Sequence, residues 1–89
     1  MTNLNKNIRI YGTDWCSDCT RSKAFLDDRK IKYSWFNIEL DPKLQKYVRK
    51  INNGKQIVPT IIFNDDTMLA EPSNKQLAKK LNIPYPINS

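Results

Sequence analysis

Apolar side chains along the chain follow two spacings, and each spacing predicts one kind of element. Short runs rich in β-branched and aromatic residues predict strands at 8–11, 33–38, 57–63 and 67–69. Segments with an apolar stripe at helical spacing predict helices at about 16–30, 42–51 and 74–81. The pattern therefore predicts the order β-α-β-α-β-β-α.

Residues at the ends of the later helices support this order. Asp41-Pro42 is a strong helix start, because an aspartate caps the first turn and proline is tolerated at the first helical position. The segment 52–54 ends that helix. Ser73 or Asn74 is a suitable cap for the last helix. The tail at 84–89 cannot continue it, because its prolines lack an amide donor.

This order predicts one α/β domain over residues 1–89, with its core at about 7–81 and a tail at 82–89. The first two strands should be parallel, because a helix connects them. Residues 64–66 form the turn of a hairpin between the last two strands. A four-stranded mixed sheet flanked by helices on both faces follows.

Composition and charge narrow the classes of partner. No apolar run is long enough to span a bilayer, and the first residues lack the apolar stretch of a secretory signal, so we expect a cytoplasmic protein without a membrane partner. The net charge of +6 is compatible with an anionic partner such as nucleic acid. Because the lysines are spread along the chain, a solvated surface without nucleic-acid binding is the preferred interpretation.

The chain has 2 cysteines and no histidine, which is too few for a multi-bridge framework or an ordinary structural zinc site. Cys16 and Cys19 form a C-x-x-C motif that has three interpretations. The motif could be half of a metal site completed by another chain, a chance pair of buried thiols, or a redox dithiol. Its place between a strand and a helix, where side chains are exposed, favours the redox dithiol.

The C-x-x-C spacing suits thiol chemistry at a helix start. Cys16 lies in the last extended position and Cys19 one turn later, so their sulfurs can meet. The helix end stabilises a thiolate at Cys16, the attacking thiol, and Cys19 is the resolving thiol. Asp18 has two interpretations. Its carboxylate either raises the pKa of Cys16 by repelling the thiolate, or is present only because an acidic side chain is favourable at a helix N-terminus. Trp15 is expected to shield one side of Cys16 or simply to pack against neighbouring side chains.

Val58-Pro59-Thr60 is the second informative segment. Proline is rare inside a strand, because it cannot donate to the ladder, so Pro59 indicates an edge, a bulge or a cis bond. A cis bond would aim the backbone of Val58 outward, where an extended substrate could pair with it.

The motifs Trp15-Cys16-x-x-Cys19 and Val58-Pro59, with the final hairpin and helix, resemble the glutaredoxin family of the thioredoxin-like superfamily, over roughly 7–81. The chain is most similar to the mycoredoxin-like and ribonucleotide-reductase-donor branches. The resemblance implies a thioredoxin-like fold and reduction of protein disulfides or of mixed disulfides with a low-molecular-weight thiol. It also implies that Pro59 is the cis-proline, and that Trp15, Val58, Pro59, Ser73 and Asn74 contact substrate.

Three segments differ from many glutaredoxins. Ser17-Asp18 stands where many have Pro-Tyr, and Thr13 stands where many have a lysine. The stretch Ala70-Glu71-Pro72-Ser73-Asn74 stands where many have two glycines followed by an acidic residue. The electron donor therefore remains open between glutathione, an analogous thiol and a flavin-dependent thioredoxin-type reductase. We expect a monomer with no bound cofactor. The alternative is an iron–sulfur carrier that uses Cys16 and a borrowed thiol at a dimer interface.

Overall fold

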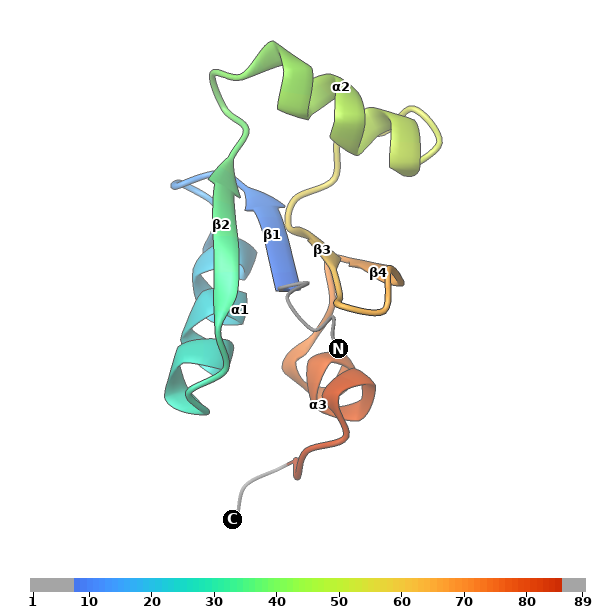
Figure 1. The fold of residues 1–89 in the computed structure, drawn as a ribbon. Helices are drawn as coiled ribbons and strands as arrows, with labels where there is room; N and C mark the ends of the chain where they lie inside the picture. The colour runs from blue at the N-terminus through green and yellow to red at the C-terminus, as the bar shows by residue number, and fades with distance from the viewer. Residues whose placement is uncertain (1–7, 86–89) are drawn as a thin grey trace.

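The computed structural model describes residues 8–85 of the chain. Its elements follow the predicted order (Figure 1). They are β1 (Ile8–Gly12), α1 (Ser17–Asp28), β2 (Tyr33–Asn37), α2 (Pro42–Ile51), β3 (Thr60–Ile62), β4 (Met68–Ala70) and α3 (Asn74–Leu81). Residues 1–7 and 86–89, which include half of the predicted tail, lie outside the described residues.

The four strands form one mixed sheet in the order β2-β1-β3-β4. β1 and β2 are parallel, as the helical crossover through α1 requires, and Ile10 pairs with Trp35. β3 is antiparallel to β1, with Ile10 opposite Ile61, and antiparallel to β4, with Ile61 opposite Leu69. The two central strands, β1 and β3, therefore carry the most buried positions of the sheet.

Helices cover both faces of the sheet, as predicted. α1 and α3 pack on one face, around a cluster of buried side chains: Ile8, Ile10, Phe25, Leu26, Ile61, Phe63, Leu77 and Ala78. α2 packs on the other face, and Figure 1 shows it beyond the end of the sheet toward which the arrows of β1 and β2 point. Its cluster contains Tyr11, Ile38, Val48 and Ile62. Ile10 and Tyr11 thus lie on opposite faces, because side chains alternate along a strand.

Each helix starts at a residue whose side chain caps it. Cys16 caps α1, Asp41 caps α2 with Pro42 at the first position, and Ser73 caps α3. Ser73 and Gln76 form a reciprocal capping box, with hydrogen bonds of 3.1 and 2.8 Å. Of the two predicted caps for the last helix, Ser73 is the one used.

The element boundaries differ from prediction by one residue at the ends of β1 and β2 and in three further places. The first helix ends at Asp28, not at Lys30, whose φ of 59° is left-handed. The last strand runs over 68–70, one residue later than predicted. The third strand covers only 60–62, because the preceding residues turn toward α2: the Thr60 hydroxyl donates to the Ile57 carbonyl at 2.7 Å and accepts from Asn52 at 3.0 Å.

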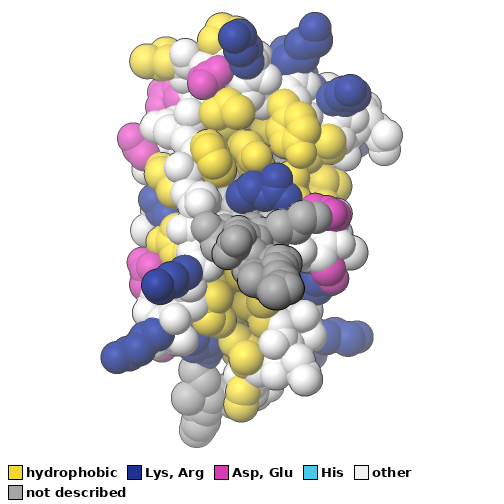
Figure 2. All heavy atoms as spheres, viewed as in Figure 1, with side chains coloured by type: hydrophobic (Ala, Val, Ile, Leu, Met, Phe, Trp, Pro, Cys, Tyr) yellow, Lys and Arg dark blue, Asp and Glu magenta, His cyan; other side chains and the backbone are white. Residues whose placement is uncertain are grey.

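The surface carries its positive charge in separate places. Figure 2 shows Lys and Arg side chains scattered around the visible face, while hydrophobic side chains gather below α2. None of the helices described between residues 8 and 85 is long and apolar enough to cross a bilayer.

Candidate functional site

The Cys16 sulfur lies at the N-terminus of α1. Its backbone is extended, with φ −86° and ψ 115°, and Sγ accepts a hydrogen bond from the Cys19 N–H at 3.1 Å. The Cys16 carbonyl accepts the first helical bond, from Thr20 N–H at 3.1 Å. At this position the sulfur accepts an amide N–H that has no acceptor within the helix, and it lies at the positive end of the helix dipole.

Cys16 is more enclosed than the sequence predicts. Only 8% of the residue is exposed, although its place between a strand and a helix suggested an exposed side chain. The thiol folds back over the first turn of α1, and its Sγ lies 3.9 Å from the Val58 carbonyl oxygen. The expectation failed because the loop that covers Cys16 lies 42 residues away in the chain.

Cys19 lies in the interior with no exposed surface. Burial raises the pKa of the Cys19 thiol to about 12, and the hydrogen bond and charge of Cys16 act in the same direction. A backbone hydrogen bond from Thr13 and the positive charge of Lys23 lower that pKa without offsetting the burial. Both cysteines are free thiols, so the structure represents the dithiol state.

Gly12, at the end of β1, leaves the space that Cys19 occupies. A Cβ atom at Gly12 would overlap the Cys19 sulfur and would approach the Trp35 ring to 2.9 Å. Lys23 covers that ring, with Nζ 3.7 Å from its centroid. Neither Gly12 nor Lys23 was predicted from the sequence as part of the site. The only sequence signal was that Lys23 follows Cys19 at i+4.

The Val58-Pro59 bond is cis, as predicted. Pro59 is buried, and its carbonyl accepts the Glu71 N–H at 2.8 Å, which joins this loop to the segment after β4. Among the described residues, the Val58 N–H has no hydrogen-bond partner. The loop therefore presents a free amide next to the Cys16 sulfur.

Trp15 and Asp18 flank the cysteines on the surface. The Trp15 residue is 70% exposed, so it is available to an incoming molecule rather than packed over Cys16. The Asp18 carboxylate accepts a hydrogen bond from Arg21 at 3.2 Å in an i,i+3 ion pair. Arg21 was not among the predicted site residues, although the i,i+3 spacing of opposite charges on a helix is a visible signal in the sequence.

Ser73 and Asn74 both make internal contacts. Ser73 caps α3, and the Asn74 side-chain oxygen accepts a hydrogen bond from Arg21 at 2.9 Å. Because the same guanidinium binds Asp18, the structure brings Asn74 to the first turns of α1. The Asn74 amide N–H groups have no partner among residues 8–85.

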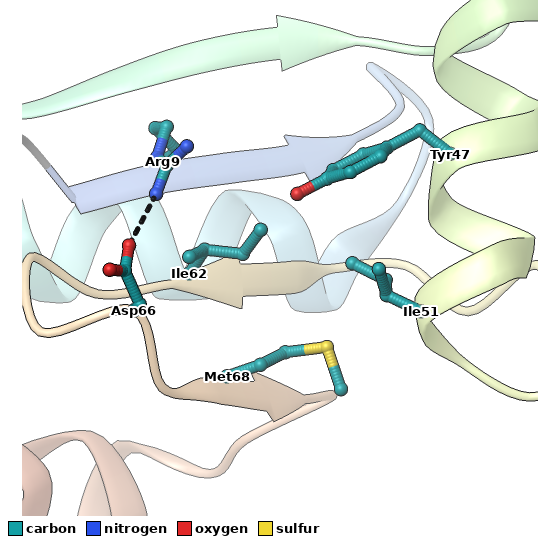
Figure 3. A pocket seen from close by; sticks show the side chains of 6 residues that line it. All are labelled: Arg9, Tyr47, Ile51, Ile62, Asp66 and Met68. Carbon is teal, nitrogen blue, oxygen red and sulfur yellow. Dashed lines mark ion pairs between the residues drawn. The ribbon is translucent and has the colours of Figure 1, made fainter.

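No group of three or more His, Cys, Asp or Glu side chains within the described residues could hold a metal ion. A separate pocket of about 290 Å³ lies between α2 and the sheet (Figure 3). Arg9 and Asp66 at its edge form an ion pair of 3.6 Å, drawn as the dashed line in Figure 3. The pocket is lined by Ile62 and Ile51 of the α2 cluster, so it lies on the sheet face opposite the core of α1 and α3. None of the predicted site residues lines it.

Comparisons with known proteins agree with this geometry. The family profile described as glutaredoxin matches residues 8–68. A glutaredoxin-named protein of Mycobacterium tuberculosis (strain CDC 1551 / Oshkosh) is 35% identical over 74 residues, which cover 83% of this chain and 88% of the relative. Mycoredoxin 1 of Corynebacterium glutamicum is 31% identical over 75 residues, which cover 84% of this chain and 92% of the relative.

Solved structures support the same fold. A mutant form of a thioredoxin-like protein has a TM-score of 0.75 at 23% identity, covering 89% of this chain and 99% of its own. A glutaredoxin from Archaeoglobus fulgidus has a TM-score of 0.73 at 21% identity, and the match covers 91% of this chain and 96% of that structure's chain. The fold is therefore thioredoxin-like. With a dithiol at a helix start and a matching family profile, the chain belongs to the glutaredoxin family, is similar to mycoredoxin and has a thiol–disulfide redox function.

Proposed function

We propose that this protein reduces protein disulfides or mixed disulfides with a low-molecular-weight thiol, with Cys16 as the attacking thiol and Cys19 as the resolving thiol. The observation that carries the proposal is the asymmetry of the two sulfurs. Cys16 Sγ receives the Cys19 N–H at the helix start, which favours a thiolate, whereas the Cys19 thiol is buried with its pKa raised to about 12.

The reaction would proceed in two exchanges. The Cys16 thiolate attacks one sulfur of the substrate disulfide, whose S–S bond breaks, and the leaving thiolate takes a proton from solvent. Cys19 then loses its proton and attacks the Cys16 sulfur of the mixed disulfide. The Cys16–Cys19 disulfide forms and the second substrate thiol leaves. Two electrons pass to the substrate, and an external thiol or a thioredoxin-type reductase restores the dithiol.

The structure suggests how Cys19 is held back until it is needed. The hydrogen bond and charge of Cys16 both raise the pKa of the Cys19 thiol. Once Cys16 is joined to substrate, it carries no charge and no longer accepts as a thiolate, so these two causes are removed. The effects of Thr13 and Lys23, which lower the pKa, then oppose burial alone. Resolution is thereby favoured after the first exchange rather than before it.

Substrate contacts are proposed at the surface around Cys16. The free N–H of Val58 and its carbonyl, released when the Cys16 thiol loses its proton, can pair with an extended substrate next to Pro59. Trp15 offers an exposed aromatic face. Ser73 and Asn74 lie at the start of α3, where the helix N-terminus and the free Asn74 amide suit an anionic group of a thiol ligand.

A coupled turnover assay tests this proposal. A protein disulfide such as insulin and a small disulfide such as bis(2-hydroxyethyl) disulfide would be offered with several thiols and with a thioredoxin-type reductase. Cys16→Ser should abolish turnover of both substrates. Cys19→Ser should retain turnover of the small disulfide with external thiol. Activity in Cys16→Ser together with its loss in Cys19→Ser would reverse the assignment of the two thiols.

A further inference from the structure

Arg21 on α1 joins two parts of the site that lie far apart in the sequence. Its Nη2 donates to Asp18 Oδ1 at 3.2 Å and to the Pro72 carbonyl at 3.3 Å, and its Nη1 donates to Asn74 Oδ1 at 2.9 Å. One guanidinium therefore connects the carboxylate between the two cysteines with the segment that enters α3, which lies more than 50 residues later in the chain.

We propose that Arg21 is a positioning residue for the Cys16 thiolate, acting through Asp18 and through residues 72–74. This inference rests on the proposed role of Cys16 as the attacking thiol. The Asp18 carboxylate lies in the first turn of α1, where a second negative charge disfavours a thiolate. Arg21 offsets that charge and holds the carboxylate on its own side of the helix.

The contacts require arginine rather than any cation. The planar guanidinium donates in two directions at once, to the α1 carboxylate and to the start of α3, whereas a lysine ammonium is a single point charge on a flexible stem. The Arg21 and Asp18 side chains are 36% and 50% exposed, so their ion pair contributes little to stability. Its main effect should therefore be on the charge near Cys16 and on the placement of the α3 start.

The charge effect can be measured without turnover. In a Cys19→Ser background only one thiol reacts, and the iodoacetamide rate of Cys16 would be followed against pH at low salt. Arg21→Gln should slow this reaction about twofold to fivefold near neutral pH, because the carboxylate is no longer offset. Adding Asp18→Asn should restore the rate. The difference should shrink at about 1 M salt, where charges are screened within about 3 Å.

The anchoring effect needs a different measurement, which is hydrogen exchange of the Ser73 and Gln76 amides, whose hydrogen bonds form the cap of α3. Arg21→Gln should speed this exchange. Arg21→Lys should restore the alkylation profile but not the protection of the Ser73 and Gln76 amides. Lys46→Gln, which removes one exposed positive charge from α2, is the matched control and should change neither.

Three results would overturn the proposal. They are an unchanged alkylation profile in Arg21→Gln at low salt, a slowing that Asp18→Asn does not relieve, and unchanged exchange of the Ser73 and Gln76 amides. Alkylation and exchange do not depend on turnover. A wild-type protein without reductase activity would therefore refute the proposed function while both tests of Arg21 remain readable.

Discussion

The buried Cys19 thiol should be nearly inert toward alkylation in the native dithiol protein, while Cys16 reacts. The perturbation is treatment of the reduced, folded protein with iodoacetamide at about pH 8. Thiolates, not thiols, are the reacting species. Because the Cys19 residue has no exposed surface and its pKa is raised to about 12, both access and ionisation oppose the reaction.

The magnitude follows from the pKa of Cys19. At about pH 8, a thiol of ordinary pKa 9.0 is ionised in about one molecule of ten, and one with a pKa of about 12 in about one of ten thousand. The Cys19 reaction should therefore be about a thousandfold slower than that of an ordinary free thiol, before any protection by burial is counted.

Intact mass against time, followed by peptide mapping, measures this difference. The native protein should gain one alkyl group quickly, at Cys16, and the second only after unfolding in guanidinium. In Cys16→Ser the thiol that raises the pKa of Cys19 is lost, but burial remains as the largest cause. Cys19 should thus stay slow in that variant. Cys19→Ser provides the matched rate for Cys16 alone.

Two results would refute this reasoning. The first is addition of two alkyl groups to the native protein at similar rates, which would mean that Cys19 is neither buried nor held protonated in solution. The second is a Cys16→Ser protein that reacts as fast as the unfolded chain. Either result would remove the asymmetry on which the proposed roles of Cys16 and Cys19 rest.

Three further predictions concern stability. The reduced protein should lose stability between about pH 9 and 12, by up to about 1.4 kcal/mol per pH unit, because the unfolded chain releases the Cys19 proton at lower pH than the folded protein does. A free energy of urea unfolding that does not change with pH, or the same slope in Cys19→Ser, would contradict this. Gly12→Ala should lower the free energy of urea unfolding by about 1–3 kcal/mol, because the added Cβ meets the Cys19 sulfur and the Trp35 ring. Adding Cys19→Ala should recover part of that loss. Full stability of Gly12→Ala alone would show that the Cys19 sulfur does not need the space beside Gly12. Ser73→Ala should lower the free energy of unfolding by about 1 kcal/mol, and with it the melting temperature, because the cap of α3 is lost. An unchanged melting curve would argue against the capping box with Gln76.

The elements and their order could be predicted from the sequence, because their signals are local. Asp41-Pro42 starts α2 through contacts within the next three residues, and Ser73 caps α3 through Gln76 in the same way. Apolar spacing identified the strands and the helices of both sheet faces. The C-x-x-C motif identified the two thiols, since its chemistry depends on four consecutive residues at a helix start.

Contacts between distant segments were decided only by the tertiary structure. Val58, 42 residues after Cys16, encloses a thiol that local reasoning placed in solvent, and the same loop shortens β3. Arg21 reaches Asn74 across 53 residues. No spacing of residues along the sequence predicts either contact, because each depends on how the loop before β3 or the start of α3 folds back onto α1. The sequence by itself therefore determined which sulfurs are present and on which element, whereas the packing of three distant segments determined their burial, charge environment and unequal reactivity.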